Sequence, residues 1–291
     1  MVRYSKPPTI AQFGASSPIE LSRAASLVIP YVNGVDLNCG CPQTWACAAN
    51  LGAALMENRE LVRDMLVETR GVMQRDGWVR DKESSRGRSL SVKIRIHKDL
   101  RKTVDFINTV IGDLQEPLVD FITIHPRTRR TPSNIPIDTD ALRFLASEFG
   151  HKIPLILSGD VFTLSSIPIP TLEKHADDDV PTPAGTGIRG VMSARAILMN
   201  PALYAGHDTC SWKVVASFMR NVVASPLPLR LVHHHLGEMC GPGPGENKAA
   251  LLDKRERTAL LKQMTMLDVI DFLDRTVDGK LGKTGGLSRI R

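Results

Sequence analysis

The sequence predicts an α/β protein built as a (β/α)8 barrel of parallel strands, incomplete at about six βα units, with a small helical domain behind it. Short Val- and Ile-rich stretches alternate with amphipathic helical patterns up to about residue 205. Polar residues follow the ends of most of these stretches. After residue 205 only helical patterns remain. These three observations predict the fold class.

The predicted strands are short, rich in Val and Ile, and often end at Gly, Cys, His or Asp. They cover residues 9–14, 34–39, 91–96, 119–125, 153–158 and 188–193. A complete barrel of this kind contains eight strands. The strands found therefore leave the predicted barrel about two units short.

Helical patterns, with apolar residues three and four positions apart, separate these strands. They cover residues 18–31, 59–74, 100–114 and 139–149. Asp99 stands directly before one apolar stripe and is a predicted N-cap. Strand and helix in repeated alternation favour parallel strands joined by crossover helices.

The chain divides into three predicted segments, which are a barrel at 1–205, a helical domain at 206–275 and a tail at 276–291. The helical domain is predicted from patterns at 212–223, 227–239, 249–263 and 267–275. The tail is rich in Gly, Lys and Arg and is expected to be disordered. Two further stretches, 80–88 and 168–187, are expected to be surface loops.

The composition narrows the class of protein. Hydrophobic residues make up 42% and charged residues 23% of the 291 residues, as in ordinary globular proteins. The sequence contains no apolar run of about 18 residues and no apolar segment of a signal peptide, so we expect a soluble, intracellular protein. Five cysteines, unevenly placed, argue against a disulfide framework and fit a reducing compartment. We expect a cytoplasmic location, from which the sequence does not distinguish the nucleus.

The net charge favours a polyanionic partner without establishing one. The chain carries a formal charge of +6 and has an isoelectric point near 9.2. Basic proteins often bind nucleic acid, and many do not. No obligatory protein partner is evident from the sequence.

Polar residues gather at the predicted carboxyl ends of the strands. They are Asn38 to Cys41, Arg95 and His97, His125 and Arg127, Ser158 to Asp160, and Ala194-Arg195. An α/β barrel collects its active site from these ends, whereas a doubly wound sheet uses mainly the switch point between two strands. Because nearly every strand contributes, the barrel is the favoured interpretation.

The most informative string is Asp36-Leu37-Asn38-Cys39-Gly40-Cys41-Pro42, at the end of a predicted strand. A cysteine in a stiff Gly-Cys-Pro turn suits a nucleophile or a general acid. A buried structural cysteine is an equally open interpretation. Metal binding through the three cysteines up to Cys47 is a third, although their spacing is not a usual zinc pattern. Nor do the three consecutive histidines at 233–235 predict a metal site, because they point in different directions on a helix.

The stretch VDLNCGCPQTWA closely resembles the signature of tRNA-dihydrouridine synthases. The cysteine ahead of the glycine and the following Pro-Gln-x-Trp-Ala resemble the eukaryotic subgroup that acts on D-loop positions 20a and 20b. The resemblance runs from about residue 8 to about residue 275. It implies an FMN-dependent oxidoreductase that uses NADPH or NADH to reduce uridine to 5,6-dihydrouridine in tRNA. Hydride is expected to reach C6 of the uracil, and Cys41 is the implied catalytic acid at C5.

The resemblance also implies which residues contact the cofactor and the substrate. The implied FMN-binding residues are Met1, Val2, Gln12, Lys93, His125, Ser158, Gly159, Asp160, Ala194 and Arg195. The implied substrate-binding residues are Asn38, Arg95 and Arg127. On the residues alone, Gln12 is equally a polar strand end, Lys93 a surface lysine and His125 a core histidine. Ser158 stands where the family usually has asparagine, and Ala194 stands where it usually has glycine.

The start of the chain departs from the family pattern. Residues 1–6 resemble the family's first strand, but the match stops at Lys6 and resumes near Thr9. A helix, a strand and a second helix are therefore expected to be missing between Lys6 and Pro7. An open barrel exposes unpaired strand edges, so we expect poor solubility or weak flavin binding.

Two rival functions follow from the sequence. One is an inactive RNA-binding remnant, favoured by the incomplete barrel. The other is a flavin barrel dehydrogenase acting on a free pyrimidine. The second rival does not explain the Asn38 to Pro42 motif, the helical appendage or the basic charge.

Overall fold

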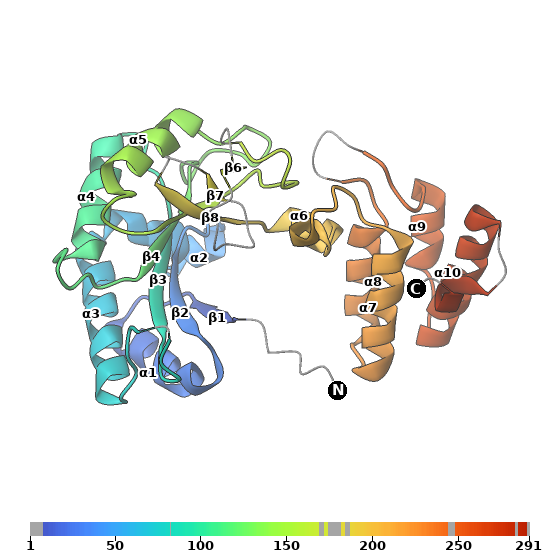
Figure 1. Ribbon diagram of the computed structural model, residues 1–291, viewed down its shortest axis with the longest axis horizontal. Coiled ribbons are helices and arrows are strands. Elements are labelled where there is room, and N and C mark those ends of the chain that lie inside the picture. The colour runs from blue at the N-terminus through green and yellow to red at the C-terminus, as the bar shows by residue number, and fades with distance from the viewer. Residues whose placement is uncertain are drawn as a thin grey trace. The chain divides into compact units, whose positions relative to one another are not determined.

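The computed structural model describes residues 8–81, 83–168, 172–173, 182–183, 187–243, 248–282 and 285–289. They belong to two compact units (Figure 1). The first unit comprises Met1–Gly159 and Ile169–Met192, and the second comprises Asp160–Pro168 and Ser193–Arg291. The division falls after Met192, not after residue 205 as predicted. One reason is local bonding, because Ser193 Oγ donates to the carbonyl of Val161 at 3.1 Å, within the second unit.

The first unit is built on a six-stranded sheet in the order β1-β2-β3-β4-β5-β8. Its strands are β1 (Ile10–Phe13), β2 (Gly34–Cys39), β3 (Ser89–Arg95), β4 (Phe121–His125), β5 (Leu155–Ser158) and β8 (Ile188–Met192). Every neighbouring pair is parallel, which confirms the predicted parallel α/β class. Strands β1 and β8 end the order, so each has one hydrogen-bonded neighbour in this sheet.

Alternation along the strands gives the sheet two different faces. One face is apolar and fully buried, with Val35, Leu37, Val92, Ile94, Ile122, Ile124 and Leu157. Helices α1 (Pro18–Val28), α3 (Arg59–Arg75), α4 (Leu100–Ile111) and α5 (Thr139–Phe149) belong to this unit. Figure 1 shows α3, α4 and α5 side by side along one side of the sheet. The other face of the sheet carries the polar residues discussed below.

Local signals explain where several helices begin. Asp99 caps α4 by accepting a hydrogen bond from the amide of Arg101, as predicted. Asp138 caps α5 in the same way through the amide of Ala141. Gly112, with φ of +71°, ends α4 earlier than the predicted residue 114.

A buried ion pair ties helix α3 to the start of β4. Arg70 Nη2 lies 2.7 Å from Asp120 Oδ2, and each side chain is 8% exposed. Arg80 also pairs with Asp120, at 2.9 Å. The described residues of the stretch 80–88 form an exposed to half-buried loop, as predicted, and Arg80 anchors its start. Arg86 and Arg88 lie over the ring of Trp78, at 4.3 and 4.4 Å from its centroid.

The structure contains short elements that the sequence patterns did not predict. They are α2 (Thr44–Ala48), the 3-10 helices η2 (Gly52–Glu57) and η3 (Leu203–Ala205), the strands β6 (Leu172–Glu173) and β7 (Thr182–Pro183), and α6 (Arg195–Met199). The helix predicted over 18–31 ends as a further 3-10 helix, η1 (Ile29–Tyr31). Segments of two to six residues are too short for a recognisable hydrophobic period. Strands β6 and β7 form an antiparallel pair within the predicted loop at 168–187, most of which lies outside the described residues.

The second unit is helical in its carboxyl-terminal part. It contains α7 (Trp212–Ala224), α8 (Leu229–Met239), α9 (Lys254–Leu260) and α10 (Met266–Leu281). These helices share an apolar core that includes Val215, Met219, Val232, Leu236, Leu260, Val269 and Leu273. No helix in the described ranges is both long and apolar enough to cross a membrane.

Two predicted boundaries in the second unit were wrong. Helix α9 begins at Lys254 rather than at 249, because Asp253 forms a capping box with Glu256. Helix α10 continues to Leu281, where disorder was expected from residue 276. Beyond it lies a 3-10 helix, η4 (Gly286–Arg289), in which the amide of Leu287 donates to Asp274 at 2.8 Å.

Candidate active site

The sheet register brings five of the predicted site residues to one face. Gln12 lies opposite Asp36, and Asp36 lies opposite Ser91. Asn38 lies opposite Lys93, and Lys93 lies opposite Thr123. Arg95 in turn lies opposite His125. Since register partners on parallel strands point to the same face, these residues form rows that lead to the carboxyl ends of the strands.

Cys41 follows β2 in a turn that is held from several sides. The side-chain oxygen Oδ1 of Asn38 accepts hydrogen bonds from the amides of Gly40 and Cys41, both at 2.9 Å. Arg95 Nε donates to the carbonyl of Gly40 at 2.7 Å. The amide of Ala53 donates to the carbonyl of Cys41 at 2.8 Å. The Cys41 side chain is half-buried, so its thiol has a defined place and partial access to solvent.

A chain of hydrogen bonds extends from this turn across three strands. Asn38 Nδ2 donates to Gln12 Oε1 at 2.7 Å, and Gln12 Nε2 donates to Asp36 Oδ2 at 2.8 Å. Ser91 Oγ donates to Asp36 Oδ1 at 2.6 Å. Burial raises the pKa of Asp36, although its bonds to Ser91 and Gln12 act in the opposite sense. Asp36 and Ser91 were missed as site residues; strand alternation places them on the same face as Asn38 and Lys93.

Lys93 lies in the middle row of this face, between Asn38 and Thr123. Burial lowers the pKa of Lys93 and the nearby Arg95 lowers it further, while Asp36 and Cys41 raise it. The hydroxyl of Thr123 is buried and has no hydrogen-bond partner among the described residues. A buried polar group without a partner is unfavourable. This part of the face therefore suits a ligand with hydrogen-bonding groups.

Arg95 and Arg127, the two arginines predicted to bind substrate, are both buried. Arg95 is 8% exposed, and its second donor, Nη1, bonds to the carbonyl of Thr128 at 2.8 Å. Arg127 is 3% exposed, and its Nε donates to the carbonyl of Ile135 at 2.7 Å. Both guanidinium groups thus bond to backbone carbonyls of neighbouring loops, and their predicted contact with a substrate stays a prediction. Burial lowers the pKa of Arg95, and Arg127 adds to this effect.

His125 and Gly159 lie against one another at the ends of β4 and β5. Arg127 Nη1 is 3.0 Å from His125 Nε2. Gly159 has φ of +103°, and a Cβ atom there would lie 2.8 Å from the Cδ2 and Nε2 atoms of the His125 ring. Any residue with a Cβ atom at this position would clash with the His125 ring. Ser158 is buried at the end of β5.

The remaining predicted cofactor residues lie outside the first unit or outside the described residues. Asp160, Ala194 and Arg195 belong to the second unit, in which Ala194 and Arg195 are exposed. Met1 and Val2 lie outside the described residues. Their predicted roles stay predictions.

The cysteines do not form a metal site in the described part of the chain. Within it, no group of three or more His, Cys, Asp or Glu side chains is placed to hold a metal ion. Cys39 is fully buried on the apolar face of the sheet, and burial raises its pKa well above the ordinary value. A buried thiol of this kind is inert. Cys47 Sγ lies 3.7 Å from the carbonyl oxygen of Cys41.

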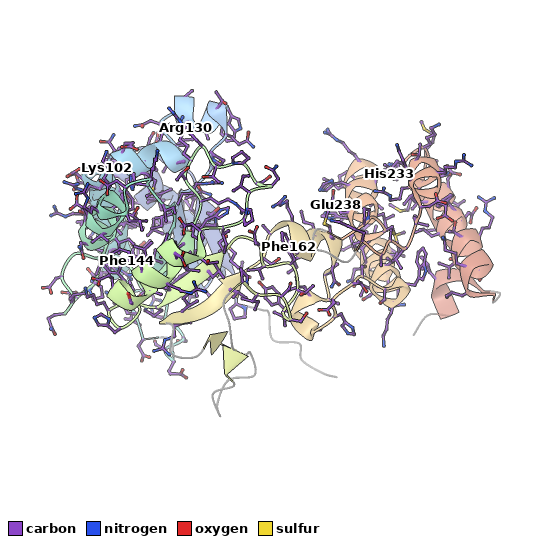
Figure 2. The ribbon with its side chains drawn as sticks, turned by 90° about the horizontal axis from the view of Figure 1, so that it is seen from above. Lys102, Arg130, Phe144, Phe162, His233 and Glu238 are labelled. Carbon is purple, nitrogen blue, oxygen red and sulfur yellow. The ribbon has the colours of Figure 1, made fainter. Side chains whose placement is uncertain are left out.

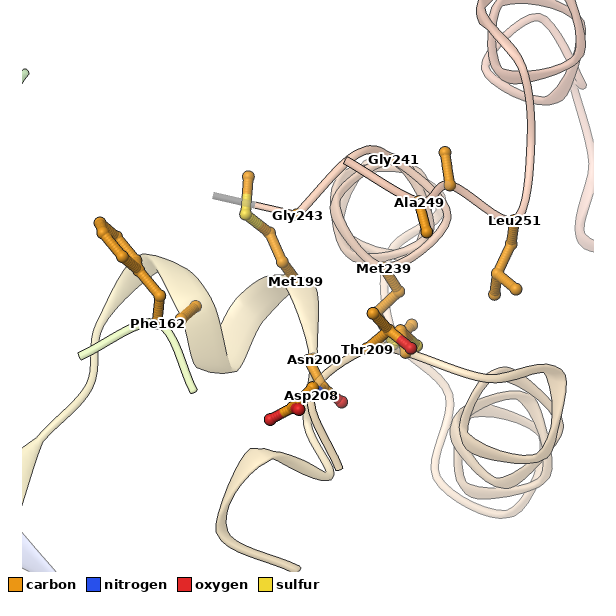
Figure 3. Close-up of a pocket in the computed structure, with 13 residues that line it drawn as sticks. Phe162, Met199, Asn200, Asp208, Thr209, Met239, Gly241, Gly243, Ala249 and Leu251 are labelled. Atoms are coloured by element: carbon orange, nitrogen blue, oxygen red, sulfur yellow. The ribbon is translucent and has the colours of Figure 1, made fainter. Parts of the chain in front are cut away.

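A separate cavity of about 160 Å³ lies within the second unit. Phe162, Met199, Asn200, Met239 and Leu251 are among the 13 residues that line it (Figure 3). None of the predicted site residues belongs to this lining. The cavity is therefore distinct from the Cys41 site.

The fold and the site together define an enzyme of the parallel α/β class, with a half-buried thiol and a half-buried lysine near the carboxyl ends of the strands. The sequence profile of the dihydrouridine synthase (Dus) family matches residues 2–249. This chain belongs to the dihydrouridine synthase family.

Individual relatives agree with this assignment. The chain is 35% identical to a Schizosaccharomyces pombe protein named tRNA-dihydrouridine(20a/20b) synthase (NAD(P)+). The matched region of 267 residues covers 91% of this chain and 70% of that protein. It is 33% identical over 263 residues to a Homo sapiens protein with the same name followed by "-like", over 90% of this chain and 72% of that one. A Saccharomyces cerevisiae protein with the first name is 33% identical over 275 residues, over 94% of this chain and 66% of that protein.

Proposed function

We propose that this protein is a tRNA-dihydrouridine synthase that reduces uridine to 5,6-dihydrouridine in the tRNA D-loop, at position 20a or 20b. The observation that carries the proposal is the Cys41 turn, held by Asn38 and Arg95 beside the row that contains Lys93. Relatives named for this activity cover most of the chain.

The described residues fit FMN on this face of the sheet. The buried hydroxyl of Thr123 has no partner in the described part of the chain and lies in register with Lys93. Gly159 leaves the ring of His125 free of a neighbouring Cβ. We infer that Gln12, Lys93 and His125 contact the flavin, and that Asp160, Ala194 and Arg195 hold its phosphate, where α/β barrels commonly bind one. When bound, FMN supplies the hydride, with NADPH or NADH as its source.

The chain's own residues then orient the uracil and supply a proton. The Cys41 thiol holds the proton that C5 of the uracil receives. Asn38 and Arg95 keep the thiol in place through the backbone of the turn. Lys93, with its positive charge, stabilises negative charge that develops in the site.

The tRNA partner is proposed from charge and exposure. Arg129 and Arg130 are exposed on the loop after β4, and Figure 2 shows Arg130 at the periphery of the first unit. Lys254 is exposed at the start of α9 in the second unit. Such side chains neutralise phosphates without reading bases. We place the enzyme in the cytoplasm, together with its tRNA.

A second candidate function is an RNA-binding protein that has lost the reductase activity. It is favoured by β1 and β8, which end the strand order with one hydrogen-bonded neighbour each. A closed barrel pairs every strand on both sides. We propose that the strand expected to be missing between Lys6 and Pro7 is one of those needed to close the barrel.

One experiment separates the two candidates. The full chain is purified, its flavin absorbance is recorded, and unmodified tRNA is incubated with it, FMN and NADPH before dihydrouridine is measured by mass spectrometry. For a synthase we expect bound flavin and dihydrouridine, with formation reduced about 10²- to 10⁴-fold by Cys41→Ala. Cys210→Ala, which changes a thiol of the second unit, is the matched control. Tight tRNA binding without flavin or product favours the second candidate.

A further inference from the structure

We infer that Gly52 is a positioning residue for Cys41, and that its lack of a side chain sets the location of the thiol. The inference rests on the proposed function, because it concerns the residue proposed to donate the proton. Gly52 begins the 3-10 helix η2 (Gly52–Glu57), eleven positions after Cys41. The sequence motif around Cys41 does not include it.

The approach of Gly52 to Cys41 leaves no room for a side chain. A Cβ atom on Gly52 would lie 2.6 Å from the carbonyl oxygen of Cys41 and 2.8 Å from its Cβ atom. It would also lie 3.2 Å from the Cys41 Cα atom. All three nearest atoms thus belong to Cys41. Two of them are backbone atoms, which move only if the turn itself moves.

This close approach lets the next residue bond to the turn. The amide of Ala53 donates to the carbonyl of Cys41 at 2.8 Å. On the other side of the same residue, Asn38 Oδ1 accepts the Cys41 amide at 2.9 Å. Both backbone polar groups of Cys41 are therefore fixed, and the direction of its Cα–Cβ bond is fixed with them. A proton donor must be placed accurately, since displacements near 1 Å reduce rates by about 10²-fold.

A second requirement at Gly52 is its backbone conformation. Its φ is +61°, a value that disfavours residues with a side chain. Gly282, at the end of α10, has nearly the same φ, +62°, and a Cβ atom there would meet nothing within 4 Å. Gly282→Ala thus reproduces the conformational penalty of Gly52→Ala without the contact. The two variants together isolate the effect of the contact on Cys41.

The test measures the reactivity of the Cys41 thiol in the full chain. Wild type, Gly52→Ala and Gly282→Ala are treated with iodoacetamide, and the alkylation rate of each cysteine is followed by peptide mass spectrometry. In Gly52→Ala the added methyl group pushes η2 away from the turn, so Cys41 is expected to react about tenfold faster through loss of local protection. Gly282→Ala is expected to leave the Cys41 rate unchanged. Equal Cys41 rates in the two variants overturn the inference.

The kinetic constants distinguish a positioning role of Gly52 from a purely structural one. With tRNA, FMN and NADPH, Gly52→Ala is expected to lower kcat for dihydrouridine formation about 10²-fold while KM for tRNA stays the same. A rise in KM with unchanged kcat contradicts a positioning role. A further outcome is that the wild type forms no dihydrouridine while the difference in alkylation rate is still present. In that case the proposed function fails, the contact between Gly52 and Cys41 stands, and the catalytic role of that contact is overturned.

A double variant covers the case in which Gly52→Ala alone does not fold. Cys41→Gly removes the Cβ atom that would lie 2.8 Å from the new methyl group. The contact with the carbonyl oxygen of residue 41, at 2.6 Å, remains, so Cys41→Gly/Gly52→Ala is expected to be more resistant to urea than Gly52→Ala but less stable than Cys41→Gly. A double variant no more stable than Gly52→Ala, while Cys41→Gly folds, contradicts the inference.

Discussion

Asn38 Oδ1 accepts a hydrogen bond from the backbone amide of Cys41 at 2.9 Å, three residues along the chain. The same oxygen accepts the amide of Gly40, so a single side chain closes the turn that carries the thiol. The other end of the Asn38 amide group donates to Gln12 on the neighbouring strand. Asn38 therefore connects the thiol turn to the sheet.

Replacement of Asn38 by alanine should loosen this turn. Asn38→Ala removes the acceptor for two amides and the donor to Gln12, and we expect a loss of about 1–3 kcal/mol in unfolding free energy. Urea titration of the apoprotein measures it. Asn108→Ala, an exposed asparagine on α4, is the control and should change little. An equal loss in both variants would show that the hydrogen bonds of Asn38 are not what stabilises the turn.

The buried hydroxyl of Thr123 should destabilise the apoprotein. Thr123→Val removes a polar group that has no partner among the described residues and keeps the side chain's shape, so we expect a gain of about 1 kcal/mol in unfolding free energy. Thr103 is equally buried, but its hydroxyl accepts the amide of His97 at 2.9 Å. Thr103→Val should therefore destabilise the protein. Urea midpoints of the two variants that shift in the same direction would contradict this explanation.

The ion pair of Arg70 and Asp120 should make stability depend on acid pH. Burial alone raises the pKa of Asp120, but Arg70, the Leu90 amide and Arg80 together outweigh it, so the pKa is lowered. Because the folded-state pKa is lowered, the ionised Asp120 stabilises the folded protein above the ordinary pKa of 3.8. This stabilisation is lost as the pH falls through the folded-state pKa. Burial lowers the pKa of Arg70, offset in part by Asp120, yet arginine stays charged in this range.

The measurement is the urea midpoint between about pH 7 and pH 3. Asp120→Asn should cost about 3 kcal/mol near neutral pH, because it leaves Arg70 buried without its anion, and should flatten the decline in acid. Asp64→Asn, an exposed site on α3, should retain the full decline. Asp36 acts in the opposite direction: its pKa is raised, so its contribution is present in acid and is lost as the pH rises. An unchanged acid decline in Asp120→Asn would exclude the ion pair as its cause.

The salt dependence of tRNA binding should distinguish Arg127 from its exposed neighbours. Each lost phosphate contact reduces the slope of log affinity against log salt by about 1. Arg127 is buried and bonds to the carbonyl of Ile135, so Arg127→Met should leave the slope unchanged and make the loop after β4 more sensitive to protease. Arg129→Gln and Arg130→Gln should each lower the slope. A reduced slope in Arg127→Met would instead support the substrate-binding role that the sequence predicts for Arg127.

Local patterns predicted the elements where strong signals mark both ends. Gly34–Cys39 and Thr139–Phe149 have their predicted bounds; the first starts at a glycine, and the second starts after the cap Asp138. The helix expected from 249 starts at Lys254, because the Asp253 cap overrides the apolar pattern before it. The helix α10 extends past the predicted residue 275, because Val277 is buried in the core shared with α7 and α8.

The candidate site was predicted in part. The Cys41 motif and a strand end pointed to Asn38 and His125, the family resemblance added Gln12 and Lys93, and the register places all four on one face. The sequence did not indicate that Arg95 bonds to Gly40, 55 positions away, because no local period connects them. It likewise did not indicate Gly52, whose importance comes from a contact rather than from a motif.

The sequence by itself determined the alternation of strands and helices, the caps and the identity of the thiol turn, since these depend on residues within a few positions of one another. The tertiary structure decided which polar side chains meet and which arginines are buried. The reason is sheet register: a shift of one residue in one strand turns its side chains to the opposite face and separates Asn38 from Gln12 and Lys93 from Thr123.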